Sequence, residues 1–152
     1  MTFVLMDTNI LLRSAQPSHS MHQVAIDAQA ELRRRGNQPC IVAQNLIEFR
    51  SVATRPASGN GLGMKEKDAD AEIRELKALY PLYADEPQIV LEWETLVSTY
   101  GAIGNQNHDA SIVAAMRVHG ISSILTFNVS DFARYPGITV LEPAGVLSPP
   151  HP

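Results

Sequence analysis

Short apolar runs alternate with longer amphipathic stretches along this chain of 152 residues. The runs at residues 3–6, 40–42, 122–127 and 138–141 have the length and composition of buried strands. The stretches between them carry apolar residues at helical spacing, which predicts helices. This alternation favours an α/β fold in which a mainly parallel sheet is covered by helices on both faces.

Five helices are predicted between these strands. Ser18 or Ser20 is placed to cap the first, and Gly36 is placed to end it. The second spans about residues 46–53, and the fifth spans residues 110–118. The third and fourth helices each have one apolar face, made of Ala69, Ile73, Leu76 and Tyr80 in the third and Ile89, Trp93, Leu96, Val97 and Tyr100 in the fourth. We expect the aromatic side chains on these faces to belong to the core rather than to form platforms for nucleobases.

The chain has the length of one domain, and neither a repeat nor a linker divides it. We predict a single domain over residues 1–145 and a proline-rich, disordered tail over residues 146–152. The only cysteine, Cys40, excludes an internal disulfide and a cysteine-based zinc site, and its place in a predicted strand favours a buried structural thiol.

No apolar run approaches the roughly 20 residues of a membrane span, and the N-terminus lacks the pattern of a signal peptide. We therefore expect a cytoplasmic protein without membrane contact. The net charge of −4 argues against broad, non-specific attraction to nucleic acid, although it permits a local basic path. Residues 33–35, three arginines, suit either a helix C-terminus or a phosphate backbone. Further candidates for backbone contact are Arg13, Arg50, Arg55, Lys65, Lys67 and Arg134.

Four acidic residues stand at the edges of apolar elements: Asp7, Glu48, Asp109 and Asp131. Asp7 follows the first predicted strand, and Asp131 lies in the turn after the third, so parallel strands would bring both to one edge of the sheet. Glu48 and Asp109 fall in early helical turns that enter from that edge. Helix capping is the structural alternative for these two, with Asn45 and Glu48 as a capping box.

If the four acids converge, they repel one another until a divalent cation neutralises them. Oxygen ligands without cysteine favour Mg²⁺ or Mn²⁺ over zinc, and such a site suits phosphodiester hydrolysis by a metal-activated water. We expect Asp7 and Asp109 to bind the metal directly, Glu48 to hold or deprotonate the water, and Asp131 to complete the acidic ring. The expected orienting residues, which fix carboxylate geometry through hydrogen bonds, are Thr8, Asn9, Thr126 and Asn128.

These segments, residues 4–12, 45–49, 108–110 and 125–132, resemble PIN domains, and specifically VapC-type toxins of type II toxin–antitoxin systems. The resemblance runs from about residue 2 to residue 143. It implies a three-layer α/β/α fold and a Mg²⁺- or Mn²⁺-dependent endoribonuclease that hydrolyses RNA. It also implies frequent homodimers and inhibition by an antitoxin protein. Asp7, Glu48 and Asp109 take the family's three principal acidic positions.

The fourth acidic position departs from the family pattern. Many relatives carry an acid where this chain has Asn128 and another where it has Asp131, so either residue is a candidate to complete the site. Two rival functions remain open. A phosphatase with Asp7 as nucleophile would need a second acid at Asn9, which is missing. A catalytically silent RNA-binding or protein-interaction module would keep the fold without needing the acids.

Overall fold

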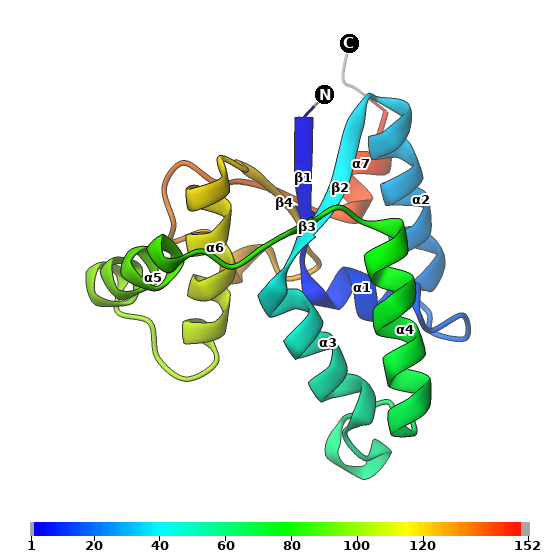
Figure 1. The fold of residues 1–152 in the computed structure, drawn as a ribbon. Coiled ribbons are helices and arrows are strands. Elements are labelled where there is room, and N and C mark those ends of the chain that lie inside the picture. Colours follow the sequence, from blue (N-terminus) through cyan, green and yellow to red (C-terminus); the bar gives the residue numbers. More distant parts are fainter. Residues whose placement is uncertain (1, 150–152) are drawn as a thin grey trace.

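The computed structural model describes residues 2–149, in which five parallel strands form one sheet between two layers of helices (Figure 1). The elements follow the order β1 (Thr2–Met6), α1 (Thr8–Ser14), α2 (His22–Arg34), β2 (Asn37–Val42), α3 (Ala43–Thr54), η1 (Ala57–Gly59), α4 (Glu66–Leu79), β3 (Leu82–Tyr83), α5 (Pro87–Tyr100), α6 (Gln106–His119), β4 (Ser123–Leu125), η2 (Val129–Asp131), β5 (Thr139–Leu141) and α7 (Pro143–Leu147). The predicted fold class, a three-layer α/β/α arrangement, is confirmed.

The strands lie in the order β3-β2-β1-β4-β5. Leu5 in β1 pairs with Cys40 in β2 on one side and with Ile124 in β4 on the other. The chain therefore leaves β1 towards β2 and β3, and later returns to the opposite side of β1. The strand order reverses between β1 and β4, and open α/β sheets bind their ligands outside the carboxyl ends of the strands at such a point.

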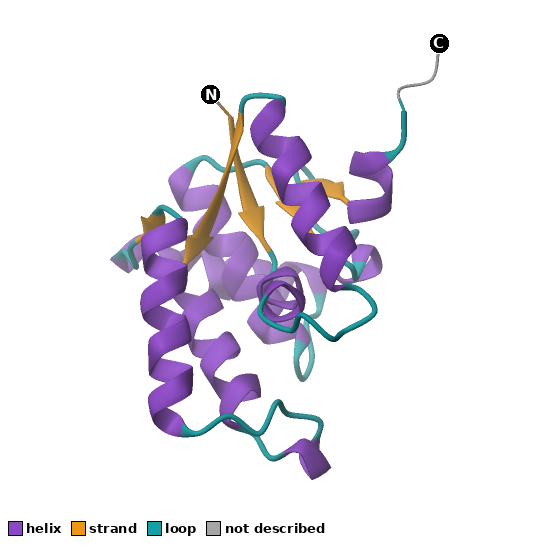
Figure 2. Cartoon of the chain, turned by 90° about the vertical axis from the view of Figure 1, so that its right-hand side faces the viewer, coloured by secondary structure: helices purple, strands orange, loops and turns teal. Residues whose placement is uncertain are grey.

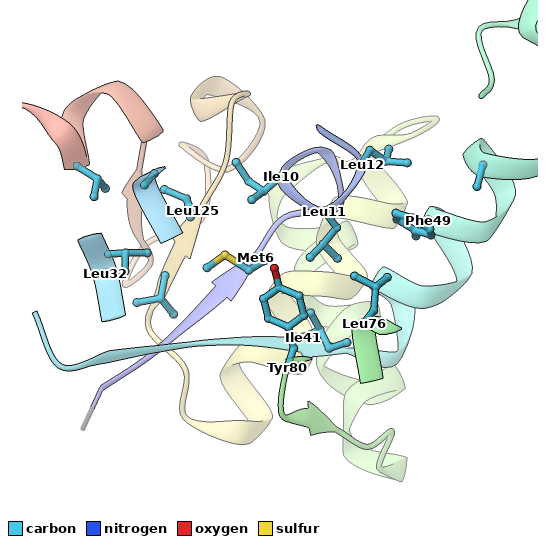
Figure 3. Packing of buried hydrophobic residues seen from close by; sticks show 14 of the residues in the cluster. Met6, Ile10, Leu11, Leu12, Leu32, Ile41, Phe49, Leu76, Tyr80 and Leu125 are labelled. Carbon is cyan, nitrogen blue, oxygen red and sulfur yellow. The ribbon is translucent and has the colours of Figure 1, made fainter. Parts of the chain in front are cut away.

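Strand β1 shows why the sheet is covered on both faces. Val4, Leu5 and Met6 are each at most 2% exposed, because successive side chains of a strand point to opposite faces and both faces are buried. Val4 and Met6 join the core cluster under α1–α4 and α7, part of which Figure 3 shows. Leu5 joins a second cluster under α5 and α6, which lie on the other side of the strands in Figures 1 and 2.

The apolar faces predicted for the third and fourth helices are confirmed in α4 and α5. Leu76 and Leu96 are buried, and Trp93 packs against the second core cluster. Pro87 begins α5, where its missing N–H costs no hydrogen bond. Gly101 ends α5 with φ of 64°, a left-handed conformation that glycine adopts without strain.

Some predicted boundaries are wrong. Helix α2 begins at His22, and neither Ser18 nor Ser20 caps it. Asn45 is not the N-cap of α3, which begins at Ala43; it is the third residue of the helix, and its Oδ1 accepts a hydrogen bond from the Val42 N–H at 2.9 Å. The other main differences are the earlier starts of β2 and α6, the shorter β4, and the unpredicted α1, η1, β3, η2 and α7.

The C-terminal end of the described chain folds onto α2. Val146 in α7 is buried, and its carbonyl oxygen accepts a hydrogen bond from Arg35 at 2.6 Å. Helix α7 thus spans the expected boundary between a domain ending at residue 145 and a tail, while residues 150–152 lie outside the described chain. Within residues 2–149, no helix is both long enough and apolar enough to cross a membrane.

Candidate active site

Asp7 lies at the carboxyl end of β1, where it is the N-cap of α1. Its Oδ1 accepts a hydrogen bond from the Thr8 N–H at 2.8 Å, and its Oδ2 accepts one from the Thr126 hydroxyl at 2.7 Å. The side chain is nearly buried, and this burial raises the pKa of Asp7 from 3.8 to about 6. The hydrogen bonds from Thr126 and Thr8 oppose the rise in pKa, whereas the carboxylates of Glu48 and Asp131 add to it.

Thr126, which follows β4 directly, connects the two strand ends at the point where the strand order reverses. Its fully buried hydroxyl donates to Asp7 and accepts from the Asn9 side-chain amide at 3.3 Å and from the Asn128 N–H at 2.9 Å. The Asn9 Oδ1 in turn accepts a hydrogen bond from the Phe127 N–H at 3.4 Å. The predicted orienting residues therefore form one network behind the Asp7 carboxylate, although Asn128 contributes its backbone and not its side chain.

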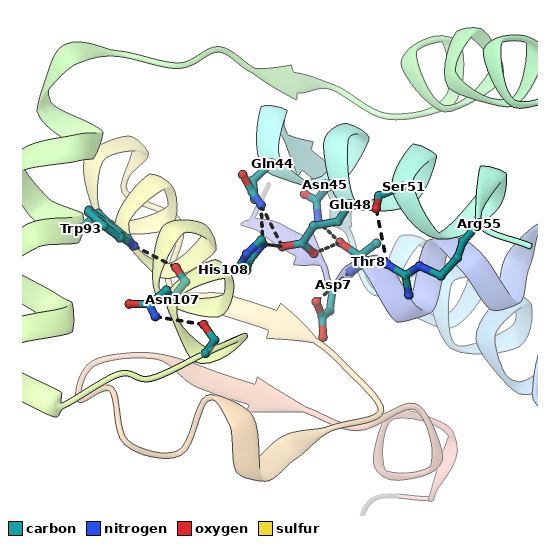
Figure 4. Close-up of polar contacts among 11 residues, drawn as sticks. Asp7, Thr8, Gln44, Asn45, Glu48, Ser51, Arg55, Trp93, Asn107 and His108 are labelled. Carbon is teal, nitrogen blue, oxygen red and sulfur yellow. Dashed lines mark hydrogen bonds and ion pairs between the residues drawn. The ribbon is translucent and has the colours of Figure 1, made fainter. Parts of the chain in front are cut away.

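Glu48 reaches the same place from α3 (Figure 4). Its Oε2 accepts a hydrogen bond from the Thr8 hydroxyl at 2.7 Å, and its Oε1 accepts one from the Gln44 amide at 3.1 Å. Nδ1 of His108 lies 4.0 Å from the same Oε1. These partners are side chains from three helices, so Glu48 does not act as the helix cap that its spacing from Asn45 suggested.

Asn45 is a functional candidate that the sequence did not reveal. It is fully buried, and its side-chain amide donates to the Met6 carbonyl at 3.0 Å and to the Thr8 hydroxyl at 3.2 Å. Together with the bond from Val42, these contacts fasten α3 to the end of β1. The sequence signal was an amide at the apolar start of a helix, and this signal also fits the capping box predicted for Asn45 and Glu48.

Asp109 lies in the first turn of α6 and makes no side-chain hydrogen bond with any residue in 2–149. Burial, and after it the carboxylates of Asp7, Asp131 and Glu48 in that order, raise the pKa of Asp109 from 3.8 to about 7, although Arg134 opposes the rise. A capping role does not explain this residue. Its carboxylate is instead coupled by charge to all three other candidate acids.

The four acids line one pocket of about 430 Å³, which we call the acidic pocket. Thr8, Asn9 and Asn128 line it too, and Thr126 is buried behind Asp7. Its remaining walls are Leu12, Gln44, Ile47, Ser51, Val52, Arg55, Asn105 and His108. Within residues 2–149, no three acidic, histidine or cysteine side chains are grouped closely enough to hold a metal ion, so the carboxylates share a pocket without converging on one point.

The donor set of the acidic pocket fits a hard divalent cation. Carboxylate oxygens dominate it, and Mg²⁺ and Mn²⁺ prefer oxygen ligands. The carboxylates around Asp7 and Asp109 also raise the pKa of both groups, which is the repulsion that a bound cation would relieve.

Two of the predicted phosphate-contacting cations adjoin the acidic pocket. Arg55 lines it, and Arg134 lies close enough to Asp109 to lower the pKa of that carboxyl while donating to Gln106 at 2.9 Å. Arg13 and Arg50 are engaged by Gln16 and by Asp70, respectively, away from the pocket. Of the three consecutive arginines, Arg34 and Arg35 pair with Glu31, and Arg33 lies over the Tyr80 ring.

The glycine-rich loop after α3, residues 57–63, folds back onto the backbone of Arg55. The Gly63 N–H donates to the Arg55 carbonyl at 2.9 Å, and the Met64 N–H donates to the Ala53 carbonyl at 2.8 Å. A Cβ at Gly61 would lie 2.0 Å from the Arg55 carbonyl oxygen, so only glycine allows the loop to fold back this tightly. The loop thereby satisfies the carbonyl groups at the end of α3.

The PIN domain model matches residues 4–138, and the chain belongs to this family. Three solved structures show the same fold. VapBC-1 from nontypeable Haemophilus influenzae has a TM-score of 0.69 at 16% identity, covering 94% of this chain and 99% of that chain. VapBC2 from Rickettsia felis, bound to a DNA fragment from its promoter, has a TM-score of 0.66 at 15% identity, covering 93% and 98%.

The third structure is Mycobacterium tuberculosis VapC20, described as a sarcin-ricin loop cleaving toxin. Its TM-score is 0.57 at 18% identity, covering 80% of this chain and 86% of that chain. At these identities the similarity shows a shared fold. No curated protein sequence matches the chain.

Proposed function

We propose that this protein is a Mg²⁺- or Mn²⁺-dependent endoribonuclease and the toxin of a type II toxin–antitoxin pair. The observation that carries the proposal is the gathering of four carboxylates in one pocket of a PIN domain, where their charges raise the pKa of Asp7 and Asp109. A stable fold gains nothing from such repulsion, whereas a phosphodiesterase uses it to bind a cation.

Each acid has a distinct role in the proposed reaction. Asp7 and Asp109 would hold the metal, and the hydrogen bonds from Thr8 and Thr126 fix the orientation of the Asp7 carboxylate. A Mg²⁺ or Mn²⁺ ion bound there would make water a better nucleophile and would stabilise the charge on the leaving oxygen. Glu48, held by Thr8 and Gln44, orients the attacking water and accepts its proton.

Asp131 adds a fourth carboxylate to the lining of the pocket, and its charge acts on both Asp7 and Asp109. Arg55 and Arg134 are the cations that would contact the RNA backbone beside the site, because they lie by the acidic pocket whereas Arg13 and Arg50 have partners elsewhere. These two arginines would offset part of the negative charge of the acidic pocket where the substrate would bind.

The partners belong to the same proposal. The structural relatives from Haemophilus influenzae and Rickettsia felis are VapBC assemblies, which supports a cognate antitoxin for this chain. The RNA substrate is supported by VapC20, which is described as cleaving the sarcin-ricin loop. A homodimer is supported by Ile47 on α3, which is 62% exposed beside an apolar hollow lined by Leu46 and Ile73. We also propose that the protein is cytoplasmic.

The decisive experiment follows the cleavage of total RNA by the purified protein. Cleavage should stop in excess EDTA and return when Mg²⁺ or Mn²⁺ is added beyond the chelator, and the same ions should raise the melting temperature because they bind the folded state. Cleavage that persists in EDTA would refute the metal mechanism. A protein that cleaves no RNA, and whose melting temperature ignores both ions, would be the silent module.

A further inference from the structure

A second pocket, of about 420 Å³, adjoins the acidic pocket and shares Gln44 and His108 with it. Its other walls are Asp85, Glu86, Ile89, Val90, Trp93, Asn107 and Ser111, contributed by the end of the β3–α5 loop, by α5 and by α6. We call it the tryptophan pocket. Its volume falls within the roughly 300–1,000 Å³ typical of small-ligand sites, and none of the proposed catalytic steps uses it.

The wall of this pocket is aromatic and aliphatic. The indole N–H of Trp93 donates to the Asn107 carbonyl at 2.8 Å, so the ring is held in place and its polar atom is already engaged (Figure 4). What Trp93 offers a ligand is therefore its ring surface. Ile89 extends that wall inside, and Val90, 52% exposed, extends it at the surface. An unstacked nucleobase is a flat ligand that binds such walls independently of its sequence context.

Carboxylates at the same pocket give it a chemical preference. Oε1 of Glu86 lies 3.9 Å from Nδ1 of His119. Asp85 is exposed, and it makes no hydrogen bond or ion pair with any residue that the structure describes. These negative charges disfavour a phosphate and favour a group rich in N–H donors. Guanine presents two adjacent donors, its ring N–H and its amino group, which match both oxygens of one carboxylate. Uracil presents a single N–H between two carbonyl groups.

We propose that the tryptophan pocket binds an unstacked guanine of the RNA, on a nucleotide next to the phosphodiester in the acidic pocket. This rests on the proposed function, because it assumes an RNA substrate. Gln44 and His108 form the shared border, so one strand can place a base on one side and its phosphate on the other. The sequence favours a core role for Trp93 over a role as a platform for a nucleobase. In this proposal Trp93 has both roles, because it packs against the second core cluster and also lines the base pocket.

Trp93 is the only tryptophan of the chain, so its fluorescence reports on the pocket directly. The probe is a single-stranded RNA pentamer of uridines with guanine, adenine, cytosine or uracil at the centre, titrated in Mg²⁺ into the Asp7→Asn variant, which should not cleave it. The guanine pentamer should quench the emission with a Kd about tenfold lower than the all-uridine pentamer, since one bidentate contact contributes about that much discrimination. Equal Kd values, or no quenching by any pentamer, would overturn the proposal.

Two matched variants test the location, added to the same Asp7→Asn background. Val90→Lys places a positive charge in the pocket beside its carboxylates, whereas Leu91→Lys makes the same change at the next residue, which is 61% exposed and does not line the pocket. Val90→Lys should abolish the preference for guanine because its charge neutralises those carboxylates, and Leu91→Lys should retain it. Identical behaviour of the two variants would contradict the assigned pocket. Asp85→Asn should also reduce the preference, and an unchanged preference would overturn the assignment of guanine.

Free guanosine monophosphate distinguishes the two sources of a guanine base. It should bind more weakly than the guanine pentamer because it places no phosphodiester in the acidic pocket, and an equal Kd would mean a nucleotide site instead of an RNA subsite. Cleavage by the wild-type protein is measured separately. RNA cleavage without any guanine preference would defeat only this inference, whereas guanine-dependent quenching without cleavage would defeat only the nuclease proposal.

Discussion

The acidic pocket and the tryptophan pocket share a border but are built in opposite ways. In the acidic pocket, the carboxylates of Asp7 and Glu48 are fastened from behind by hydroxyl and amide groups, and Asp7 is only 7% exposed. In the tryptophan pocket, the wall is a ring fixed by one hydrogen bond, and the charged residues at its mouth are exposed. The first pocket thus holds a buried carboxylate, Asp7, whereas the second exposes apolar side chains such as Val90 to solvent.

Because of this difference, the two pockets lower the free energy of unfolding in different ways. Buried like charges destabilise the native state in proportion to their ionisation, so the acidic pocket imposes a cost that depends on pH and on cations. The open apolar wall imposes a cost that depends on neither, since it arises from contact with water. The removal of a charge should therefore change the stability of the protein strongly at the acidic pocket and weakly at the tryptophan pocket. This expectation can be tested.

The largest expected effect is on catalysis by the acidic pocket. Asp109→Asn should lower kcat of RNA cleavage by more than the about 100-fold that loss of an outer hydrogen-bonding partner can cause, because it removes a proposed metal ligand. The matched control is Asp68→Asn, an exposed acid in the first turn of α4, just as Asp109 stands in the first turn of α6. If both variants lose stability alike and neither loses specific activity, Asp109 is a helix-end charge and not a ligand.

A smaller effect is expected from Thr126→Val, which keeps the shape but removes the hydroxyl that orients Asp7. Activity should fall by about 10–100-fold, and the free energy of unfolding should fall by about 1–3 kcal/mol because the Asn9 amide and Asn128 N–H lose their acceptor. The pKa of Asp7 should rise further, moving the acid limb of the pH–rate profile to higher pH. An unshifted limb would show that Thr126 only supports the fold.

The sequence predicted this site better than it predicted the surrounding elements. Asp7 and the turn that holds Asp131 are predicted at one edge of the sheet because parallel strands end at the same edge, a rule that needs only strand direction. Strand β3 was missed because Leu82–Tyr83 is too short to show a period, and it exists only by pairing with β2. Asn45 was misjudged because its partners, Met6 and Thr8, lie far away in the sequence, and no local pattern encodes such contacts.

A still smaller effect is expected of pH on the free energy of unfolding, measured in EDTA so that no divalent cation is bound. Asp7 and Asp109 have a pKa of about 6 and about 7 in the folded state against 3.8 ordinarily, so the folded state binds more protons in between. The free energy of unfolding should therefore fall as pH rises from about 4.5 to 7. Glu31, whose pKa its partner arginines lower to about 2, loses its contribution only at more acidic pH.

Asp109→Asn isolates this electrostatic cost. The variant should be more stable than the wild type by about 1 kcal/mol at pH 8, after allowance for solvent screening of a partly exposed group, and equal to it near pH 4. Urea titrations at the two pH values measure the difference. Val90→Ala, in the other pocket, changes only the apolar wall and should show no such dependence, and a similar dependence there would remove the distinction between the two pockets.

The smallest effect separates Asp131 from Asn128. Asp131→Asn should lower activity by roughly tenfold, because its charge acts on both Asp7 and Asp109. Asn128→Ala should cost less, since the contact of Asn128 with Thr126 comes from its backbone N–H. Single-turnover cleavage rates decide between them, and equal, negligible losses would exclude both from the site.

Cys40 allows the opening of the sheet at its centre to be measured. Its buried Sγ lies 3.6 Å from the Val4 carbonyl oxygen, and burial raises the pKa of the thiol to about 12. Because only a thiolate reacts readily with alkylating reagents, this residue stays inert until β1 and β2 separate. Because the chain has no other cysteine, the rate of alkylation measures how often the sheet opens. Mass spectrometry can follow this rate even in a mixture of many proteins.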